Sequence, residues 1–303
     1  MTMNGRAEEA AAWSQFWAKN TGGDQGGCLP KRWAAIEEAQ RAAWYGFIAD
    51  LPQQAAVLDL ATGDGRVLRW MREARPDLDL AGVDLAPDLP AAPEGTRVTG
   101  GVAMEDVPEP DDSFDAIVSQ FGFEYGDTEK VAGEIARMLK RGGKVGLMVH
   151  RGDGPILEHN KTRREAIGWA ITEKSACEVA RTALTAPNGG PEAAAHVGAA
   201  LALLGSRKYG QESPAWEIPE ALRRAGLMAE RTELDEALET IAAIEAQAHN
   251  ELGRIASLER ACAAADARDG LLEAFKAKSL SLASTTAIAE PSGRALADFL
   301  ILS

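Results

Sequence analysis

The sequence VLDLATGDG, from Val57 to Gly65, is the stretch that decides the fold of this chain. Its apolar start predicts a buried strand, and its glycines predict a tight turn before the helical pattern that follows. A second apolar run, GVDLAP, carries an acid at Asp84 where its strand ends. Strand, glycine turn, helix and acid-ended strand form a β-loop-α-β unit that binds a nucleoside-containing cofactor.

The residues around the two glycines separate two cofactor classes. Gly63 and Gly65 let the backbone approach a ligand, but no G-x-G-x-x-G pattern follows to cradle a pyrophosphate. Instead Asp59 precedes the glycines, and this acid suits a ligand that carries an ammonium and a sulfonium, as S-adenosylmethionine does. The alternative is a strand-turn-helix corner whose glycines serve only the turn.

Two further stretches extend this pattern along the chain. They are AMEDVPEPDDSFDAIVSQFGFEY, Ala103 to Tyr125, and EIARMLKRGGKVGLMVH, Glu134 to His150. With the glycine loop, the region from Ala55 to His150 resembles class I S-adenosylmethionine-dependent methyltransferases, especially methyltransferase type 11 proteins of the ubiquinone/menaquinone-biosynthesis kind. The resemblance implies an α/β fold, a doubly wound Rossmann-like seven-stranded sheet, here with added α-helical cap insertions.

Carried over residue by residue, the resemblance implies a set of positions that contact the cofactor. They are Asp59, Ala61, Gly63, Gly65, Asp84, Leu85, Met104, Glu105, Ser119, Gln120 and Phe121. The first four would face the methionine part, Asp84 the ribose hydroxyls, and Leu85 the adenine ring. Met104 and Glu105 would border the adenine edge, and the last three would lie below the sulfonium.

This chain departs from the family pattern at two positions. Ala61 stands where many members have glycine, although an Ala-Thr-Gly loop also occurs among them. Ala103 stands where an Asp or Asn often contacts the adenine amine. Backbone groups of Met104 and Glu105 are therefore expected to take over that contact.

Candidate groups on the methyl-acceptor side lie at or just past strand ends: Gln120, Glu124, Tyr125, His150 and Arg151. His150 is a candidate general base, since an unperturbed imidazole titrates near neutral pH; the alternative is a structural hydrogen-bonding role. Glu124 is a candidate proton acceptor or amine partner, or else a solvated loop acid. Methyl transfer depends mainly on positioning, and it needs a base only when the acceptor is a poor nucleophile.

Composition narrows the possible partners. Of 303 residues, 32 are Lys or Arg and 46 are Asp or Glu, so the net charge is −14 and nucleic-acid phosphates would be repelled. Cys28, Cys177 and Cys262 form no metal-binding pair, so we expect no metal and a reducing cytoplasmic setting. No signal peptide and no membrane-spanning run is evident. A soluble monomer or homodimer acting on a small molecule is expected.

Apolar periodicity predicts the remaining elements. Helices are expected over Glu8–Lys19, Arg32–Asp50, Pro155–Ala186, Pro191–Gly205 and Trp216–Ala225, the last covering the sheet, and from Glu236 to about Ser281. Strands are expected over Ala56–Leu60, Leu80–Asp84, Arg97–Val102, Phe114–Gln120, Lys144–His150, Leu227–Leu234 and, antiparallel, Arg294–Leu302. The glycine-rich segment Thr21–Pro30 is either a mobile lid over the cofactor or a connector.

These elements suggest a division of the chain into four parts. Residues 1–50 would hold the N-terminal helices and lid, and 51–150 the cofactor-binding core. Residues 151–216 would form a helical insertion, and 217–303 the end of the core with a second insertion near 236–290. The function expected is methyl transfer from S-adenosylmethionine to a small-molecule acceptor. The alternatives are a catalytically idle relative that binds a partner through its helical inserts and a nucleotide-cofactor oxidoreductase.

Overall fold

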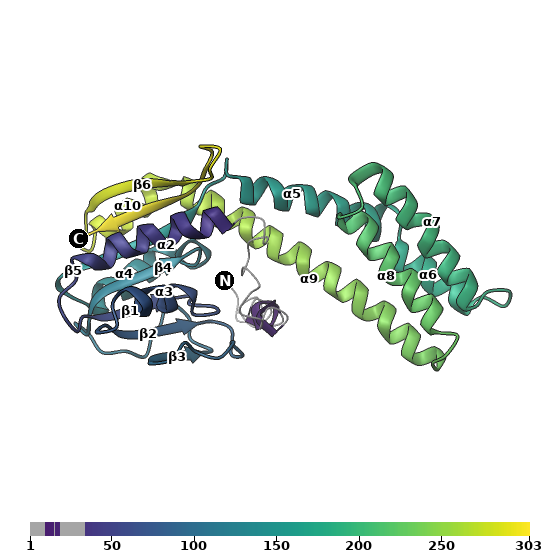
Figure 1. The fold of residues 1–303 in the computed structure, drawn as a ribbon, viewed down its shortest axis with the longest axis horizontal. Coiled ribbons are helices and arrows are strands. Elements are labelled where there is room, and N and C mark those ends of the chain that lie inside the picture. The colour runs from purple at the N-terminus through teal and green to yellow at the C-terminus, as the bar shows by residue number, and fades with distance from the viewer. Residues whose placement is uncertain (1–9, 15, 19–33) are drawn as a thin grey trace. The chain divides into compact units, whose positions relative to one another are not determined.

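The computed structural model describes residues 10–14, 16–18 and 34–303, and the glycine-rich segment Thr21–Pro30 lies outside them. The chain forms two compact units, which are considered separately (Figure 1). The sheet unit consists of the residues up to Leu157 together with Leu258–Ser303, and the helical unit consists of Glu158–Ser257.

The sheet unit is built on seven strands in the order β3-β2-β1-β4-β5-β7-β6. Their bounds are β1 Ala56–Leu60, β2 Asp79–Asp84, β3 Thr96–Gly100, β4 Phe114–Gln120, β5 Leu139–His150, β6 Leu282–Ala289 and β7 Ala295–Leu302. The first five strands pair in parallel, whereas β7 runs antiparallel to both β5 and β6. The carboxyl ends of β1, β2, β4 and β5 therefore meet at one edge of the sheet.

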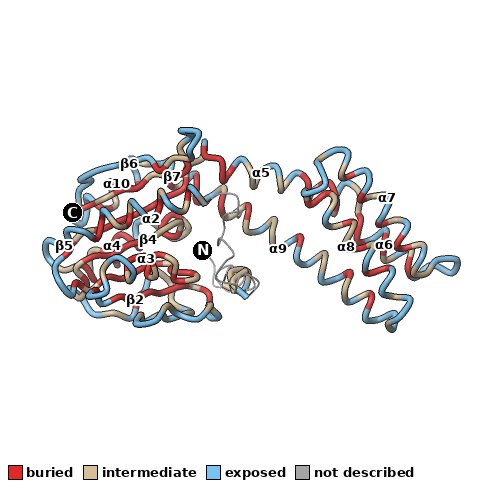
Figure 2. The backbone as a smooth tube through the Cα atoms, viewed as in Figure 1, coloured by how far each residue is buried: buried red, intermediate tan, exposed pale blue. Residues whose placement is uncertain are grey.

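Helices cover both faces of this sheet because alternate strand residues point to opposite sides. Val57 packs in one cluster with α2 (Ala34–Ala49) and α3 (Arg66–Ala74). Leu58 packs in the other with α4 (Thr128–Met138) and α10 (Arg268–Lys276). Strands β1, β2, β4, β5 and β7 lie largely buried between these layers (Figure 2). The fold is thus the predicted doubly wound seven-stranded sheet.

Most predicted strands are confirmed, because buried parallel strands leave continuous apolar runs in the sequence. The predictions over Ala56–Leu60 and Phe114–Gln120 match β1 and β4 residue for residue. The final strand, predicted as antiparallel over Arg294–Leu302, is β7 and pairs antiparallel with β5.

The predicted sixth strand, Leu227–Leu234, is wrong. Helix α8 (Pro214–Met228) continues through its first residues, and α9 (Leu234–Asp266) begins at its last. Leu227 and Met228 are 41% and 52% exposed, so no sheet buries the apolar side chains that suggested a strand. The helix predicted over Trp216–Ala225 exists as part of α8, but it packs on α7 in the helical unit and does not cover the sheet.

The strand that completes the sheet is β6, which the sequence analysis missed within its second helical insertion. Its sequence, LASTTAIA, is mostly small and polar, and its first six residues are exposed. An edge strand with only Ile288 buried gives no apolar alternation to read. The long predicted helix also ends earlier, dividing at Ala267 into α9 and α10.

The helical unit is held together by close approach of α7 (Pro191–Tyr209) and α8. Its other helices are α6 (Ala176–Thr185), the π-helical segment Trp169–Glu173, and the parts of α5 (Pro155–Gly168) and α9 that fall within Glu158–Ser257. Three glycines make the approach possible: a Cβ on Gly198, Gly205 or Gly226 would meet the backbone of the facing helix. The helix predicted over Pro191–Gly205 is confirmed as α7, which extends to Tyr209. The single helix predicted over Pro155–Ala186 is helical for most of its length but is divided into α5, the π-helical segment and α6, because Ser175 takes a left-handed conformation with φ of +46°.

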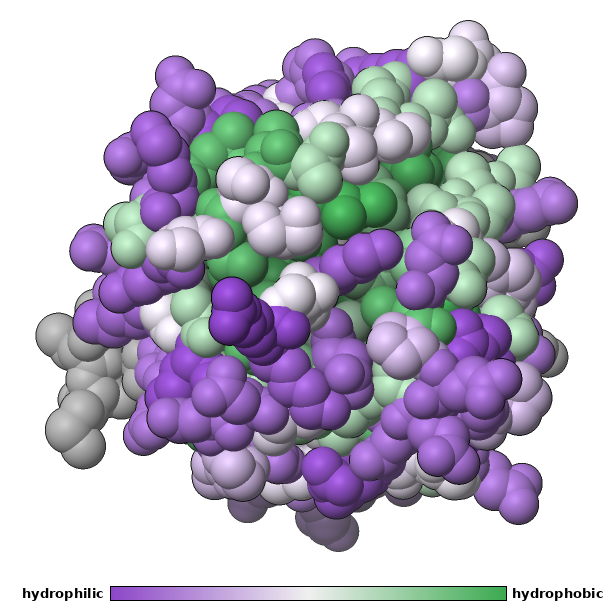
Figure 3. All heavy atoms as spheres, turned by 90° about the vertical axis from the view of Figure 1, so that its left-hand side faces the viewer, coloured by the Kyte–Doolittle hydropathy of each residue, from purple (hydrophilic) through white to green (hydrophobic). Residues whose placement is uncertain are grey.

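Exposed apolar side chains are concentrated in the helical unit. Among the described residues, the large exposed hydrophobics there are Val179, Leu203, Leu204, Leu227, Met228 and Leu234, whereas the sheet unit exposes Leu282. The face turned toward the viewer in Figure 3 is mostly hydrophilic and carries one hydrophobic area in its upper half. None of the helices formed by the described residues is long and apolar enough to cross a bilayer.

Replacing Gly205 with alanine should destabilise the helical unit. The added Cβ would overlap the backbone oxygen of Ala215, so α7 and α8 would have to separate. Overpacking of this kind lowers the free energy of unfolding by about 1–3 kcal/mol. The control is Gly253→Ala on α9, where a Cβ meets nothing within 4 Å. Alanine there should raise the free energy of unfolding by roughly 0.5–1 kcal/mol. Urea denaturation of both variants tests this, and equal effects would contradict it.

Candidate functional site

The predicted site residues come from the carboxyl ends of β1, β2, β4 and β5 and from the loops that follow them, except for Met104 and Glu105, which follow β3. Because β1 lies between β2 and β4, and β4 next to β5, these loops are neighbours at one edge of the sheet. In doubly wound sheets, ligands bind at this edge. The fold therefore brings the residues predicted to contact the cofactor and those predicted on the methyl-acceptor side to the same edge of the sheet.

The Asp84 carboxylate ties the end of β2 to the glycine loop. Its Oδ2 accepts a hydrogen bond from the backbone N–H of Gly63 at 2.9 Å, and its Oδ1 accepts one from the N–H of Ala86 at 2.9 Å. Gly63 and Gly65 have φ of +55° and +68°, values that favour glycine. Asp84 is 7% exposed, and this burial raises its pKa above the ordinary value. The loop geometry thus depends on this carboxylate.

Asp59 is a second buried acid beside this loop, at 1% exposure. Its Oδ2 accepts a hydrogen bond from the Thr62 hydroxyl at 2.7 Å, while its Oδ1 has no hydrogen-bond partner within the described part of the chain. Burial raises the pKa of Asp59 to about 8, and the nearby Asp84 carboxylate adds to the rise. A carboxyl group in this state is suited to pair with a cationic group of a ligand.

The turns after β1 and β4 are fitted closely to each other. Ala61 has φ of +57°, in the left-handed region that favours glycine. A Cβ on Gly122 would meet the Cβ of Ala61 at 2.5 Å. The Ser119 hydroxyl donates to the Leu60 carbonyl oxygen at 2.9 Å and accepts from the Phe123 N–H at 3.0 Å. Ser119 therefore joins these two turns.

The residues expected along the adenine are half-buried. Leu85 follows the Asp84 carboxylate directly, and Met104 packs against the apolar cluster that includes α4. The Glu105 Oε1 accepts a hydrogen bond from the Asp127 N–H at 3.1 Å, at the start of that helix. The side chains of Met104 and Glu105 thus have structural contacts, and adenine recognition by their backbone groups stays a prediction.

Glu124 and His150 form a buried pair on the acceptor side. The Glu124 Oε1 lies 2.7 Å from His150 Nδ1 and also accepts the backbone N–H of His150 at 2.9 Å. The His150 ring stacks on Phe121, with ring centroids 4.3 Å apart, and meets the Tyr125 ring edge to face at 5.9 Å. The structure therefore brings four of the sequence-predicted residues into direct contact.

The Gln120 side chain at the end of β4 is hydrogen-bonded by side chains of α2. Its Oε1 accepts a hydrogen bond from the Trp44 indole at 2.6 Å, and its Nε2 lies 3.5 Å from the Gln40 Oε1. Gln40 is fully buried, and its Nε2 lacks a partner in the part of the chain that the structure describes. Neither residue was predicted as part of the site: the spacing of Trp44 indicates a core residue, and Gln40, the one polar residue in that apolar helix face, was the usable signal.

Arg151, the remaining predicted group, takes part in ion pairs. Its guanidinium binds Asp298 at 2.9 Å and Asp153 at 2.8 Å, and these carboxylates raise its pKa. Arg268 binds the second oxygen of Asp298 at 2.7 Å. This network fixes the chain just past the end of β5 and leaves His150 as the residue there that faces the aromatic rings.

Aromatic residues of the N-terminal segment contact the same loops. Residues 10–14 and 16–18 are helical, in agreement with part of the helix predicted over Glu8–Lys19. The Trp13 ring meets Tyr125 edge to face, with centroids 5.8 Å apart. The Trp17 indole lies against Gly63, so that a Cβ on this glycine would overlap it.

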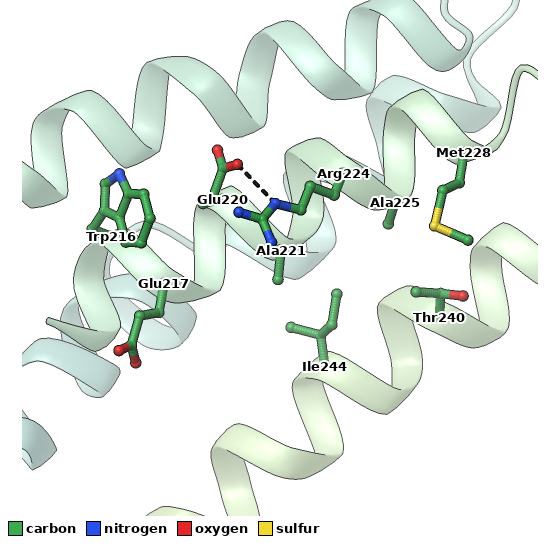
Figure 4. Close-up of a pocket in the computed structure, with 9 residues that line it drawn as sticks. All are labelled: Trp216, Glu217, Glu220, Ala221, Arg224, Ala225, Met228, Thr240 and Ile244. Atoms are coloured by element: carbon green, nitrogen blue, oxygen red, sulfur yellow. Dashed lines mark hydrogen bonds and ion pairs between the residues drawn. The ribbon is translucent and has the colours of Figure 1, made fainter. Parts of the chain in front are cut away.

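A separate groove lies in the helical unit between α8 and α9. Its volume is about 370 Å³, and its walls carry Trp216, Met228 and Ile244 beside the ion-paired Glu220 and Arg224 (Figure 4). None of the sequence-predicted site residues lines this groove. We therefore place the candidate site at the strand ends of the sheet unit.

Replacing Asp59 with asparagine should remove a pH-dependent loss of stability. The folded protein keeps the Asp59 proton up to about pH 8, whereas the unfolded chain loses it near 3.8, the ordinary pKa of an aspartic acid. Between these values the native state binds more protons, so the free energy of unfolding falls as pH rises, by about 1.4 kcal/mol per pH unit at most. Asparagine preserves the acceptor for Thr62. Urea denaturation from pH 5 to 9 should show that the free energy of unfolding falls less with rising pH in the variant than in the wild type. An equal fall in both proteins would contradict this.

Comparison with known proteins identifies the domain that carries the site. Residues 58–147 match a family described as methyltransferase domain. A demethylmenaquinone methyltransferase of Thermus thermophilus is 33% identical over 113 residues, 34% of this chain and 51% of that protein. One of Thermotoga maritima is 38% identical over 93 residues, 29% of this chain and 41% of that protein. The chain thus spans about half of these relatives or less.

A solved structure, that of a sugar N-methyltransferase from Streptoalloteichus, is 29% identical with a TM-score of 0.29, over 38% of this chain and 47% of that one. The region matched by the family contains Asp84 and the turns that follow β1 and β4, the first of which is the glycine loop. It stops just before the end of β5. Residues 58–147 are thus similar to a methyltransferase domain, and the sheet that contains them has the fold of class I S-adenosylmethionine-dependent methyltransferases.

Proposed function

We propose that this protein transfers a methyl group from S-adenosylmethionine to a small-molecule acceptor. The observation that carries the proposal is the pair of buried acids at the glycine loop. Asp84 is fixed by two backbone N–H groups, and Asp59 beside it keeps one oxygen without a partner among the described residues. Such a site suits a ligand with hydroxyl donors and a positive charge.

The residues present fit this cofactor. Each Asp84 oxygen accepts one backbone hydrogen bond and retains a lone pair for a ribose hydroxyl. The unpartnered Oδ1 of Asp59 would accept from the ammonium group, whose charge favours the ionised carboxyl. When bound, S-adenosylmethionine supplies a methyl group on a sulfonium centre. The backbone of Ala61, Gly63 and Gly65 would lie along its methionine part.

The acceptor would bind where β4 and β5 end. Gln120, Phe121, Glu124, Tyr125 and His150 supply hydrogen-bonding and aromatic groups there. A net charge of −14 opposes a nucleic-acid acceptor. The two bacterial relatives named as demethylmenaquinone methyltransferases support a small organic acceptor. The apolar and aromatic character of this side of the site agrees with such a molecule.

Replacing Asp84 with alanine should abolish most cofactor binding. The change removes the acceptor for the Gly63 N–H and for the ribose hydroxyls, and hydrogen bonds to a charged group are worth about 1.5–3 kcal/mol each. The dissociation constant for S-adenosylmethionine, measured by titration calorimetry, should rise roughly 100-fold or more. The control is Asp79→Ala, at the exposed start of the same strand, which should bind as the wild type does.

The same calorimetry separates the alternative functions. Binding of S-adenosylmethionine and S-adenosylhomocysteine without binding of NAD supports the proposal, and labelled methyl transfer to a panel of small molecules then identifies the acceptor. Binding of NAD alone would indicate an oxidoreductase. Binding of S-adenosylmethionine without transfer to any acceptor would favour a catalytically idle protein that binds a partner through its helical residues.

A further inference from the structure

We propose that His150 is the catalytic base for an acceptor that carries a hydroxyl group, and that Glu124 is its positioning residue. The inference rests on the proposed function, since it concerns the acceptor side of that same site. It identifies the chemical class of the acceptor as a phenol or enol, whose oxygen becomes a strong nucleophile when its proton is removed.

The hydrogen bonds to Glu124 determine which ring nitrogen of His150 carries the proton. Glu124 Oε1 is held in place by the backbone N–H of His150 at 2.9 Å and lies 2.7 Å from Nδ1. Because an ionised carboxylate only accepts hydrogen bonds, Nδ1 carries the proton in the neutral ring. Nε2 is then left with a lone pair, which is the form that a general base requires.

The two side chains of the pair differ in exposure. The Glu124 side chain is 0% exposed and the His150 side chain 7% exposed, so of the two side chains the imidazole is the one with surface that a bound molecule would contact. Within the described residues, Nε2 has no hydrogen-bond partner, and the Glu124 Oε2 is buried without one. The carboxylate thus lies behind the ring, where it stabilises positive charge on the imidazole.

Aromatic contacts hold the ring in one orientation. Phe121 stacks on it at 4.3 Å with the planes 33° apart, and Tyr125 meets it at 5.9 Å with the planes 71° apart. Phe121 has φ of +56°, a strained value for a bulky residue, and its N–H donates to the Met148 carbonyl oxygen at 2.8 Å. Strain of this kind persists where the surroundings over-determine it, often at functional sites.

The proton transfer balances the charge of the reaction. The hydroxyl oxygen uses an electron pair to bond the methyl carbon, the methyl–sulfur electron pair goes to sulfur, and the hydroxyl proton goes to Nε2. The positive charge that was on the sulfonium ends on the imidazolium, beside the Glu124 carboxylate. An amine acceptor attacks through its own lone pair and needs no base before attack, so the pair matters most for a hydroxyl acceptor.

The position of the ring proton is the first test, and it requires no acceptor. In ¹⁵N-histidine-labelled protein saturated with S-adenosylhomocysteine, His150 is one of four histidines and is assigned with the His150→Gln variant. Long-range ¹H–¹⁵N spectra at pH 8 should show its proton on Nδ1. In Glu124→Ala, which removes the acceptor of that proton, the Nε2–H form should appear. A proton on Nε2 in the wild type would overturn the proposal.

The second test compares 1-naphthol with 1-naphthylamine, which share a ring and differ in the nucleophile. His150→Gln should lower kcat for 1-naphthol by about 10²–10⁴-fold and for the amine far less, with S-adenosylmethionine affinity unchanged. Glu124→Gln keeps an oxygen for Nδ1 but loses the charge, so kcat should fall without a change in KM, and the pH–rate profile should move. His196→Gln, at an exposed position of helix α7, is the control.

Three outcomes would overturn the role of His150 while leaving the proposed function intact. They are equal losses on both probes, methylation of the amine alone, and an unchanged pH–rate profile in Glu124→Gln. If neither probe is methylated, the proposal is judged by the first test alone: a proton on Nδ1 of His150 supports it, and a proton on Nε2 overturns it. Failure of the wild type to bind S-adenosylmethionine would instead overturn the proposed function itself.

Discussion

The tie between Asp84 and the glycine loop is the interaction on which the rest of the site depends. A carboxylate at the end of β2 accepts N–H groups of Gly63 and Ala86, and so fixes the turn after β1 against its neighbouring strand. The loop can take this path because its glycines adopt positive φ. Asp59, near the end of β1, is buried beside it, and a positively charged partner would offset the free energy that ionising this carboxyl group costs.

On the acceptor side, too, a buried acid is held by hydrogen bonds at the end of a strand. Glu124 and His150 are buried together, and each satisfies part of the other's hydrogen-bonding capacity. Buried polar groups of this kind rigidify a site when they are paired and mark a ligand position when one atom is left unpaired. Asp59, Gln40 and Glu124 each keep one such atom among the described residues. Asp59 and Glu124 lie at the carboxyl edge of the sheet, and Gln40 lies on α2 next to Gln120 at the end of β4.

The helical unit follows a different packing rule. Its two most closely packed helices, α7 and α8, approach until backbone touches backbone, and glycines replace the side chains that would hold them apart. Ion pairs such as Arg163 with Glu251 at 2.6 Å, partly buried, add directional contacts within the unit. A unit rich in alanine gains little from large side chains, so its stability depends on this close approach.

The sequence by itself determined the parallel part of the sheet, the glycine loop and the acids at the strand ends. Buried parallel strands leave apolar runs, and a loop with positive φ needs glycine, so both are visible in local sequence. Only the tertiary structure decided that Glu124 binds His150, that Gln40 and Trp44 hold Gln120, and that β6 completes the sheet. These contacts join residues 26 to 80 positions apart or pair an exposed edge strand, and no local pattern records such pairings.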